Sequence, residues 1–423
     1  MSEILFKNAR IIDPDRNIDT IGDLGVADGV IADCGKLKNP EVVDLSGKVL
    51  THGFLDVHVH LRQPGNTNAE TIESGSKAAA AGGFTTIVAM PNTKPAADTV
   101  GAIELLRSIS SQQAVVNVLP CGCMTINSEG KEMAPIGSLK SAGIAALSDD
   151  GKCVQDHALM RHIVEYAKSF NLPILDHCED TALAAGGVMH EGKWSVLLGF
   201  NGISAASEEL IVARNIILSR LVDWKIHMQH ISVKESVEMI RQARKRGIKV
   251  TGEATPHHIT LTDEKIKTFD TNYKMNPPLR SEEDRIALIE GIADDTITVI
   301  ATDHAPHTRT AKMVEFDYAP FGIIGLETAF ALCYTELVAK GVISLDRLIA
   351  KLTTGPADVM GIENFNLAEG NPADLVVIDP AAEYVIDKEK FLSKARNTPF
   401  DGMTVKGRIE RTIVGGKTVF QLR

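Results

Sequence analysis

The chain has 423 residues, more than one ordinary domain needs, and this length suits a parallel α/β barrel of about 250 residues with one smaller unit. Lys and Arg number 44 against 55 Asp and Glu, and the resulting net charge of −11 argues against nucleic acid as a partner. The longest weakly polar run, 78–91, is short for a membrane span, and Gly82 and Gly83 interrupt it, so we predict no span. The start of the chain has an acid at Glu3 and no apolar signal core, which predicts a cytoplasmic protein with reduced cysteines.

The first 52 residues contain short hydrophobic pieces broken by turn signals. A hairpin is expected over Val26–Ile31, where Asp28-Gly29 supplies the turn. Such short strands predict β structure for this segment.

The region from residue 53 to residue 365 has a different pattern of hydrophobic runs. Short runs rich in Val, Ile and Ala alternate with longer amphipathic stretches, such as Gln155–Phe170 and Ser204–Arg220, which we interpret as helices. Eight such βα units predict a (β/α)₈ barrel of the TIM type, so the fold class is α/β. The predicted strands are Phe54–His60, Thr85–Met90, Val115–Pro120, Ile144–Ser148, Pro173–His177, Lys225–His230, Lys249–Glu253 and Thr296–Thr302.

The segment 366–423 resembles the first 52 residues, because it also contains short hydrophobic pieces broken by turn signals. Strands are expected at Ala373–Ile378 and in a hairpin over Arg408–Phe420 around Gly415-Gly416. Because the ends of a barrel chain can lie close together, we predict that 1–52 and 366–423 form one small β-sandwich domain beside the barrel. Two independent tails are the alternative, but each would have a poor core alone.

Candidate metal ligands begin at the end of the first predicted strand. Its sequence, Asp56-Val57-His58-Val59-His60-Leu61-Arg62, places His58, His60 and Arg62 at alternate positions, which face the same way in a strand. A His-x-His pair alone is weak support for a metal site, because two solvated histidines on a surface strand would look the same.

Other predicted strands also end in ligand-type residues. Active sites of such barrels lie at the carboxyl ends of the strands, and four imidazoles with two carboxylates would suffice for two divalent ions such as Zn²⁺. His177 and His230 could instead be hydrogen-bonded core residues, and Asp303 a helix cap. These strand ends carry Asp149 and Asp150, equally plausible by composition, and His177, His230 and Asp303.

Longer motifs carry a resemblance to a known family. The motifs are Asp56-Val57-His58-Val59-His60-Leu61-Arg62-Gln63-Pro64-Gly65, Met90-Pro91-Asn92-Thr93, Ser148-Asp149-Asp150-Gly151, Asn276-Pro277-Pro278-Leu279-Arg280, Thr302-Asp303-His304-Ala305-Pro306-His307 and Ala319-Pro320-Phe321-Gly322. Together they resemble the amidohydrolase superfamily and, within it, the class I dihydroorotases, over nearly the whole chain.

The resemblance implies a site with one or two Zn²⁺ ions per subunit, two being favoured. Asp150 would bridge the ions where many relatives use a carboxylated lysine, and no lysine stands at the end of the fourth strand. Asp303 would also be the catalytic acid-base group, taking a proton and passing it to the leaving nitrogen. The implied metal ligands are His58, His60, Asp150, His177, His230 and Asp303.

The implied reaction is the interconversion of N-carbamoyl-aspartate and dihydroorotate, an acidic cyclic amide. Arg62 would bind the substrate carboxylate bidentately, with donors from Asn92 and His307 nearby. The resemblance further places Asn276 and the backbone at Phe321 and Gly322 against the ring amide. His60 would belong to both the metal and the substrate set.

Several expectations concern the surroundings of the site. The stretch from His307 to Ala319 has mixed charge and few apolar residues, which predicts a mobile lid.

Rival interpretations are another cyclic amidase, such as a hydantoinase or allantoinase, and a noncatalytic subunit that only scaffolds a partner enzyme. A homo-oligomer is the default for such an enzyme, and a complex with aspartate carbamoyltransferase is compatible with activity.

Overall fold

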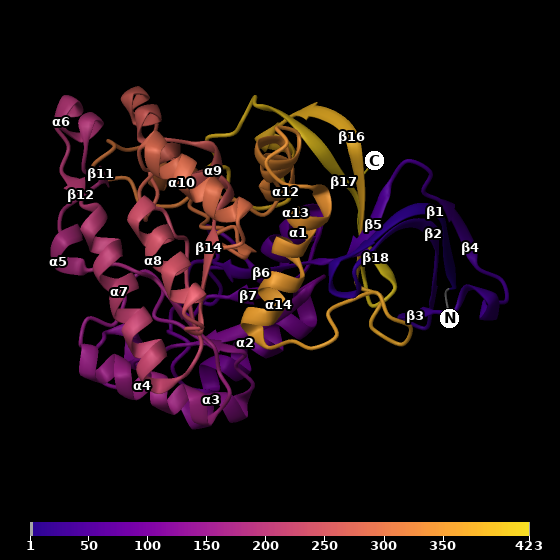
Figure 1. Ribbon diagram of the computed structural model, residues 1–423, viewed down its shortest axis with the longest axis horizontal. Coiled ribbons are helices and arrows are strands. Elements are labelled where there is room, and N and C mark those ends of the chain that lie inside the picture. Colours follow the sequence, from indigo (N-terminus) through magenta and orange to yellow (C-terminus); the bar gives the residue numbers. More distant parts are fainter. Residues whose placement is uncertain (1–2, 423) are drawn as a thin grey trace.

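The computed structural model describes residues 3–422 (Figure 1). Helices surround a bundle of central strands, and a twisted sheet containing strands from both ends of the chain lies to one side of them. No helix in this part of the chain is at once long and apolar enough to cross a membrane.

The central strands form one parallel sheet of eight, as predicted. They follow chain order from β6 to β15, leaving out only a separate two-stranded pair, β11 (Met189–His190) and β12 (Gly202–Ile203). A parallel bridge from Val59 to His304 links the first strand to the residues just after the last. The eight strands are β6 (Phe54–Val59), β7 (Phe84–Ala89), β8 (Asn117–Gly122), β9 (Ala146–Leu147), β10 (Ile174–Asp176), β13 (Ile226–Met228), β14 (Val250–Ala254) and β15 (Val299–Ile300).

Six of the eight strands end one or two residues earlier than predicted on the side that carries the candidate ligands, whereas β8 and β14 end later, at Gly122 and Ala254. His230 and Asp303 follow β13 and β15 with positive φ angles of 33° and 45°, which ladder pairing does not allow. Such left-handed backbone in non-glycine residues is costly and is concentrated at functional sites. The predicted strands therefore exist, but their last residues turn out of the sheet toward the site.

The helices begin and end close to the predicted positions where a prediction was made. Asp156 caps α4 by accepting from the backbone of Ala158 and Leu159. The helices are α1 (Ile72–Ala81), α2 (Val100–Gln113), α3 (Ile136–Ala142), α4 (His157–Ser169), α5 (Thr181–Ala184), α6 (Lys193–Leu198), α7 (Ala205–Val222), α8 (Lys234–Lys245), α9 (Pro256–Thr260), α10 (Glu282–Ala293), α11 (Arg309–Lys312), α12 (Ala329–Cys333), α13 (Leu345–Leu352) and α14 (Thr354–Met360).

The second sheet joins the two ends of the chain. Its order is β18-β17-β16-β5-β1-β2-β3, with β4 paired to β1, and the two ends of the chain meet in the antiparallel pairing of β16 with β5 and in a bridge from Val30 to Pro372. Both predicted hairpin turns are confirmed, at Asp28-Gly29 and at Gly415-Gly416. The strands are β1 (Ile4–Asp13), β2 (Ile18–Ala27), β3 (Val30–Ala32), β4 (Glu41–Asp44), β5 (Val49–His52), β16 (Leu375–Val385), β17 (Thr404–Val414) and β18 (Lys417–Gln421).

A shared core explains why the two ends combine. Phe6 and Leu50 from the first segment pack in one buried cluster with Leu375, Val377 and Ile413 from the second. Neither segment alone would bury these side chains. The β unit built from both ends is thus confirmed. Its proposed limits at 1–52 and 366–423 stay a prediction, and residues 1, 2 and 423 lie outside the described part.

Candidate metal centre

All six predicted ligands lie together at the carboxyl ends of the barrel strands. They make up three overlapping groups, and within each group the ligand atoms lie within 4.8 Å of one another. Every member is buried. The groups are His58, His230 and Asp303; His58, His60 and Asp150; and Asp150, His177 and His230.

Asp150 lies at the middle of the cluster. Its Oδ1 is 3.3 Å from His58 Nε2, 3.7 Å from His177 Nδ1 and 3.9 Å from His230 Nε2, and its Oδ2 is 3.4 Å from His60 Nε2. One carboxylate thus faces four imidazoles with its two oxygens, so it lies beside every histidine of the cluster.

The neighbouring Asp149 was as plausible a metal ligand as Asp150 by composition, but it binds backbone groups instead. Its carboxylate accepts hydrogen bonds from the backbone N–H groups of Met124 and Thr125 and from the Thr125 hydroxyl. These bonds direct the side chain into the loop after β8 and away from the imidazoles. Burial raises the pKa of Asp149 to about 6, against these hydrogen bonds. The structure thus distinguishes two adjacent aspartates that the sequence left open.

The donor set fits a divalent cation. His58 Nε2 is fully buried and has no hydrogen-bond partner, although it lies 3.3 Å from Asp150 and 3.5 Å from Asp303 Oδ1. Burial opposes charge on this ring, yet Asp303, Asp150 and Glu253 together raise the pKa of His58 well above its usual value. The pocket therefore favours positive charge at this position, and imidazole and carboxylate donors suit Zn²⁺.

His230 differs from His58 in its charge preference. Burial, His177 and His58 lower its pKa well below the usual value, so its imidazole stays neutral. A neutral imidazole is the form that ligates metal.

Arg62 lies at the edge of the cluster, but not for the reason that strand alternation suggested. Strand β6 ends at Val59, so alternation does not extend to Arg62, and the residue has a left-handed φ of 58°. The turn directs Arg62 Nε to the carbonyl of Pro306, 3.1 Å away. Burial lowers the pKa of Arg62, and the negative charges of Asp303 and Asp150 oppose that shift.

Asn92 directly contacts two candidate ligands. Its Oδ1 lies 3.0 Å from His60 Nδ1, and its Nδ2 donates to Asp150 Oδ2 at 3.2 Å. Asn276 contacts another residue near the cluster, because its Nδ2 donates to Glu179 at 2.8 Å. Its buried Oδ1 has no hydrogen-bond partner. An unpaired buried carbonyl is costly and is available to a ligand N–H.

His307, Phe321 and Gly322 form one compact wall. His307 Nε2 donates to the Phe321 carbonyl at 2.7 Å, and burial lowers the pKa of His307 to about 3. Gly322 has a φ of 148°, and a Cβ there would lie 2.6 Å from the Ala305 carbonyl and 2.8 Å from the His307 ring. Only glycine therefore allows this close approach.

The segment predicted as a mobile lid contains the short helix α11. Lys312 Nζ, which is buried, donates to the carbonyls of Thr271 at 3.0 Å, Lys274 at 3.4 Å and Pro320 at 2.8 Å. Burial and the nearby Lys274 lower the pKa of Lys312 to about 7. The mobility of this segment stays a prediction. If the segment opens, the hydrogen bonds of Lys312 have to break.

Asn397 is a residue of the site region that the sequence did not indicate. It is buried, its Nδ2 donates to the carbonyls of Ala305 and Gly322 at 3.0 Å each, and its Oδ1 accepts from the His307 N–H at 3.0 Å. One amide therefore ties two loops of the site to the C-terminal segment. No local signal marks it, since it lies 90 residues from His307 in sequence.

We expect Asn397→Ala to reduce kcat/KM about 10²-fold, because loops displaced by about 1 Å lose productive substrate geometry. Steady-state kinetics beside a thermal unfolding curve would check this. Asn371→Ala is the matched control, since Asn371 Nδ2 likewise donates to backbone carbonyls, those of Asn364 and Asn366. Equal kinetic losses in both variants would contradict a specific role for Asn397.

Comparisons with known proteins agree with the geometry. A family model described as Dihydro-orotase-like matches residues 47–236. A relative named Dihydroorotase from Solibacter usitatus is 49% identical over 98% of this chain and 97% of its own length, and one from Bacillus cytotoxicus is 48% identical over 99% and 98%. The solved L-hydantoinase (dihydropyrimidinase) from Arthrobacter aurescens superposes with a TM-score of 0.90 at 26% identity, covering 100% of this chain and 96% of that one.

An α/β barrel with a β-rich unit and a buried cluster of histidines and aspartates at its strand ends defines the class of metal-dependent cyclic amide hydrolases. The relatives narrow that class, because their identity extends over almost the full chain. The chain belongs to the dihydroorotase family.

Proposed function

We propose that this chain catalyses the reversible, zinc-dependent cyclisation of N-carbamoyl-L-aspartate to (S)-dihydroorotate and water in pyrimidine biosynthesis. The observation that carries the proposal is the place of Arg62 beside the cluster: it follows His60 by two residues, and its Nε donates to the carbonyl of Pro306, three residues after Asp303. A guanidinium there suits a substrate with a free carboxylate, which hydantoin and allantoin do not have.

The six residues of the cluster would hold Zn²⁺, with two ions favoured and Asp150 available to both. Zn²⁺ held there would supply Lewis-acid chemistry for the reacting carbonyl and for water at neutral pH. In hydrolysis Asp303 takes a proton from water and returns it to the leaving ring nitrogen, and in cyclisation it moves the proton the other way.

The remaining side chains hold the substrate. Arg62 binds the carboxylate, and Asn92 and His307 add hydrogen bonds beside it. The ring amide lies against Asn276 and the backbone at Phe321 and Gly322. The unpaired Oδ1 of Asn276 supports this placement, because a ring N–H would satisfy it.

The setting of the enzyme belongs to the same proposal. We expect a cytoplasmic homo-oligomer whose partners are the small-molecule substrate and, in some assemblies, aspartate carbamoyltransferase. Scaffolding without catalysis is disfavoured, because a noncatalytic chain would have no need to keep all six candidate ligands together.

The experiment is dihydroorotate hydrolysis by the purified chain, followed by ultraviolet absorbance with and without a zinc chelator. We expect chelation to abolish turnover and added Zn²⁺ to restore it. Hydantoin and allantoin serve as substrate controls. Turnover of hydantoin in place of dihydroorotate would reassign the substrate, and full activity after complete metal removal would contradict the proposed metal dependence.

A further inference from the structure

A chain of hydrogen bonds runs through the barrel interior beneath the metal centre. Glu253 Oε1 lies 2.7 Å from His58 Nδ1, and Glu253 Oε2 lies 2.9 Å from His227 Nε2. His227 Nδ1 in turn lies 2.8 Å from the Thr251 hydroxyl. All residues of this hydrogen-bond network except His58 come from the strands β13 and β14. Their side chains are buried or nearly so.

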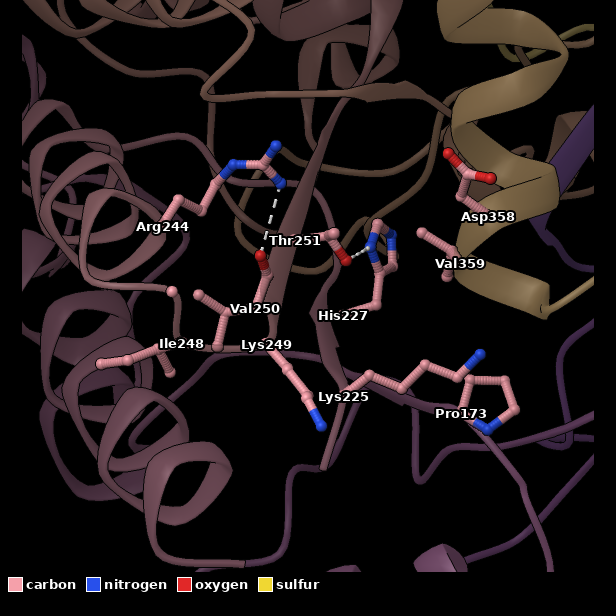
Figure 2. A pocket seen from close by; sticks show the side chains of 11 residues that line it. Pro173, Lys225, His227, Arg244, Ile248, Lys249, Val250, Thr251, Asp358 and Val359 are labelled. Carbon is pink, nitrogen blue, oxygen red and sulfur yellow. Dashed lines mark hydrogen bonds between the residues drawn. The ribbon is translucent and has the colours of Figure 1, made fainter. Parts of the chain in front are cut away.

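The end of this hydrogen-bond network that is farthest from His58 lies at a cavity, on the side of the barrel opposite the candidate ligands. The cavity has a volume of about 370 Å³ and is lined by the first residues of β13 and β14 together with α14. Figure 2 shows His227 at this cavity with its ring bonded to Thr251. His227 thus separates the cavity from Glu253, which faces the metal centre.

Glu253 acts on two candidate ligands at once. Since a carboxylate can only accept, the bond to His58 requires hydrogen on Nδ1, so the neutral ring has its Nε2 lone pair toward Asp150 and Asp303. The same Oε1 accepts from the His230 backbone N–H at 3.0 Å, and His230 has the left-handed φ of 33°. The carboxylate therefore fixes a ring tautomer and holds a strained backbone.

We propose that Glu253 is a positioning residue of the metal centre, oriented by His227 and Thr251. It sets His58 and His230 for metal binding before the metal arrives. A carboxylate behind a ligating histidine orients the ring and increases its basicity. The proposal rests on the proposed function only in taking the six-residue cluster as the metal site.

The test is the Zn²⁺ affinity of Glu253→Gln, measured by competition with a coloured chelator. The amide keeps the size of the side chain but offers one acceptor oxygen for three donors, so we expect affinity to fall about 10- to 100-fold. Glu253→Asp should restore part of the loss. His227→Phe, which removes the bonds to Glu253 and Thr251 but leaves Glu253 bonded to His58 and His230, should lose less than Glu253→Gln.

A matched control separates positioning from general destabilisation. Glu208→Gln also neutralises a buried carboxylate of the barrel, one that accepts from the backbone of Ser232 and Val233 and contacts no candidate ligand. We expect its Zn²⁺ affinity to stay within about twofold of the unaltered chain, even where its metal-free thermal midpoint falls.

Two results would overturn the inference. One is unchanged Zn²⁺ affinity in folded Glu253→Gln, or in folded His227→Phe should the first variant fail to fold. The other is an equal loss of affinity in Glu208→Gln. An unaltered chain that binds Zn²⁺ tightly but does not turn over dihydroorotate would overturn the proposed substrate and leave this inference standing, because metal affinity is measured without substrate.

Discussion

Asp303→Asn is expected to lower kcat by about 10²- to 10⁴-fold while the chain still binds metal. The asparagine keeps an oxygen at the edge of the cluster, where Asp303 Oδ1 lies 3.0 Å from His60 Nε2. It cannot take up the proton that the reaction transfers, because an amide is not a base at neutral pH. Steady-state kinetics and metal analysis of the same preparation would measure both properties.

Asp358→Asn is a suitable control for this variant. Asp358 is a carboxylate of α14 that lines the cavity at the opposite end of the barrel, so its kinetics should match those of the unaltered chain. Full activity of Asp303→Asn with metal bound would show that the proton passes through another group. Loss of metal together with activity would instead make Asp303 essential as a ligand.

Arg62→Met should raise the Michaelis constant for dihydroorotate about 10- to 100-fold and change kcat little. A hydrogen bond to a charged group contributes about 1.5–3 kcal/mol, and a carboxylate that binds equally well in ground and transition states affects KM first. Methionine retains much of the apolar stem and removes the charge. Initial rates over a range of dihydroorotate concentrations would measure the effect.

Arg309→Met provides the matched control. Arg309 is an exposed cation of the predicted lid that pairs with Glu389 at 3.2 Å, and its replacement should leave KM within about twofold. A fall in kcat for Arg62→Met without a rise in KM would place Arg62 at the reacting atoms and not at the substrate carboxylate.

Strand order and the positions of the candidate ligands could be read from the sequence because both leave local signals. Each buried parallel strand is a short apolar run, and candidate ligands follow such runs closely, as His177 and His230 do. The hairpin at Asp28-Gly29 has a similarly local signal, since positive φ angles favour these residue types.

The backbone at the strand ends left no such signal. Alternation correctly brought His58 and His60 to one cluster but did not apply to Arg62, because the left-handed φ of 58° at Arg62 ends the extended run after His60. Composition could not separate Asp149 from Asp150 either. That choice depends on the N–H groups of Met124 and Thr125, which a loop from another strand brings to Asp149.

By itself, the sequence determined the barrel, the shared β unit and, apart from the choice between Asp149 and Asp150, the candidate ligands, since periodicity, turn residues and strand-end chemistry act over a few neighbouring positions. The tertiary structure alone decided which residues support the site. Asn397 and Glu253 become visible only when segments 90 and 195 residues away, at His307 and His58, fold against them. A buried donor or acceptor must find a partner, and chain distance does not limit which one it finds.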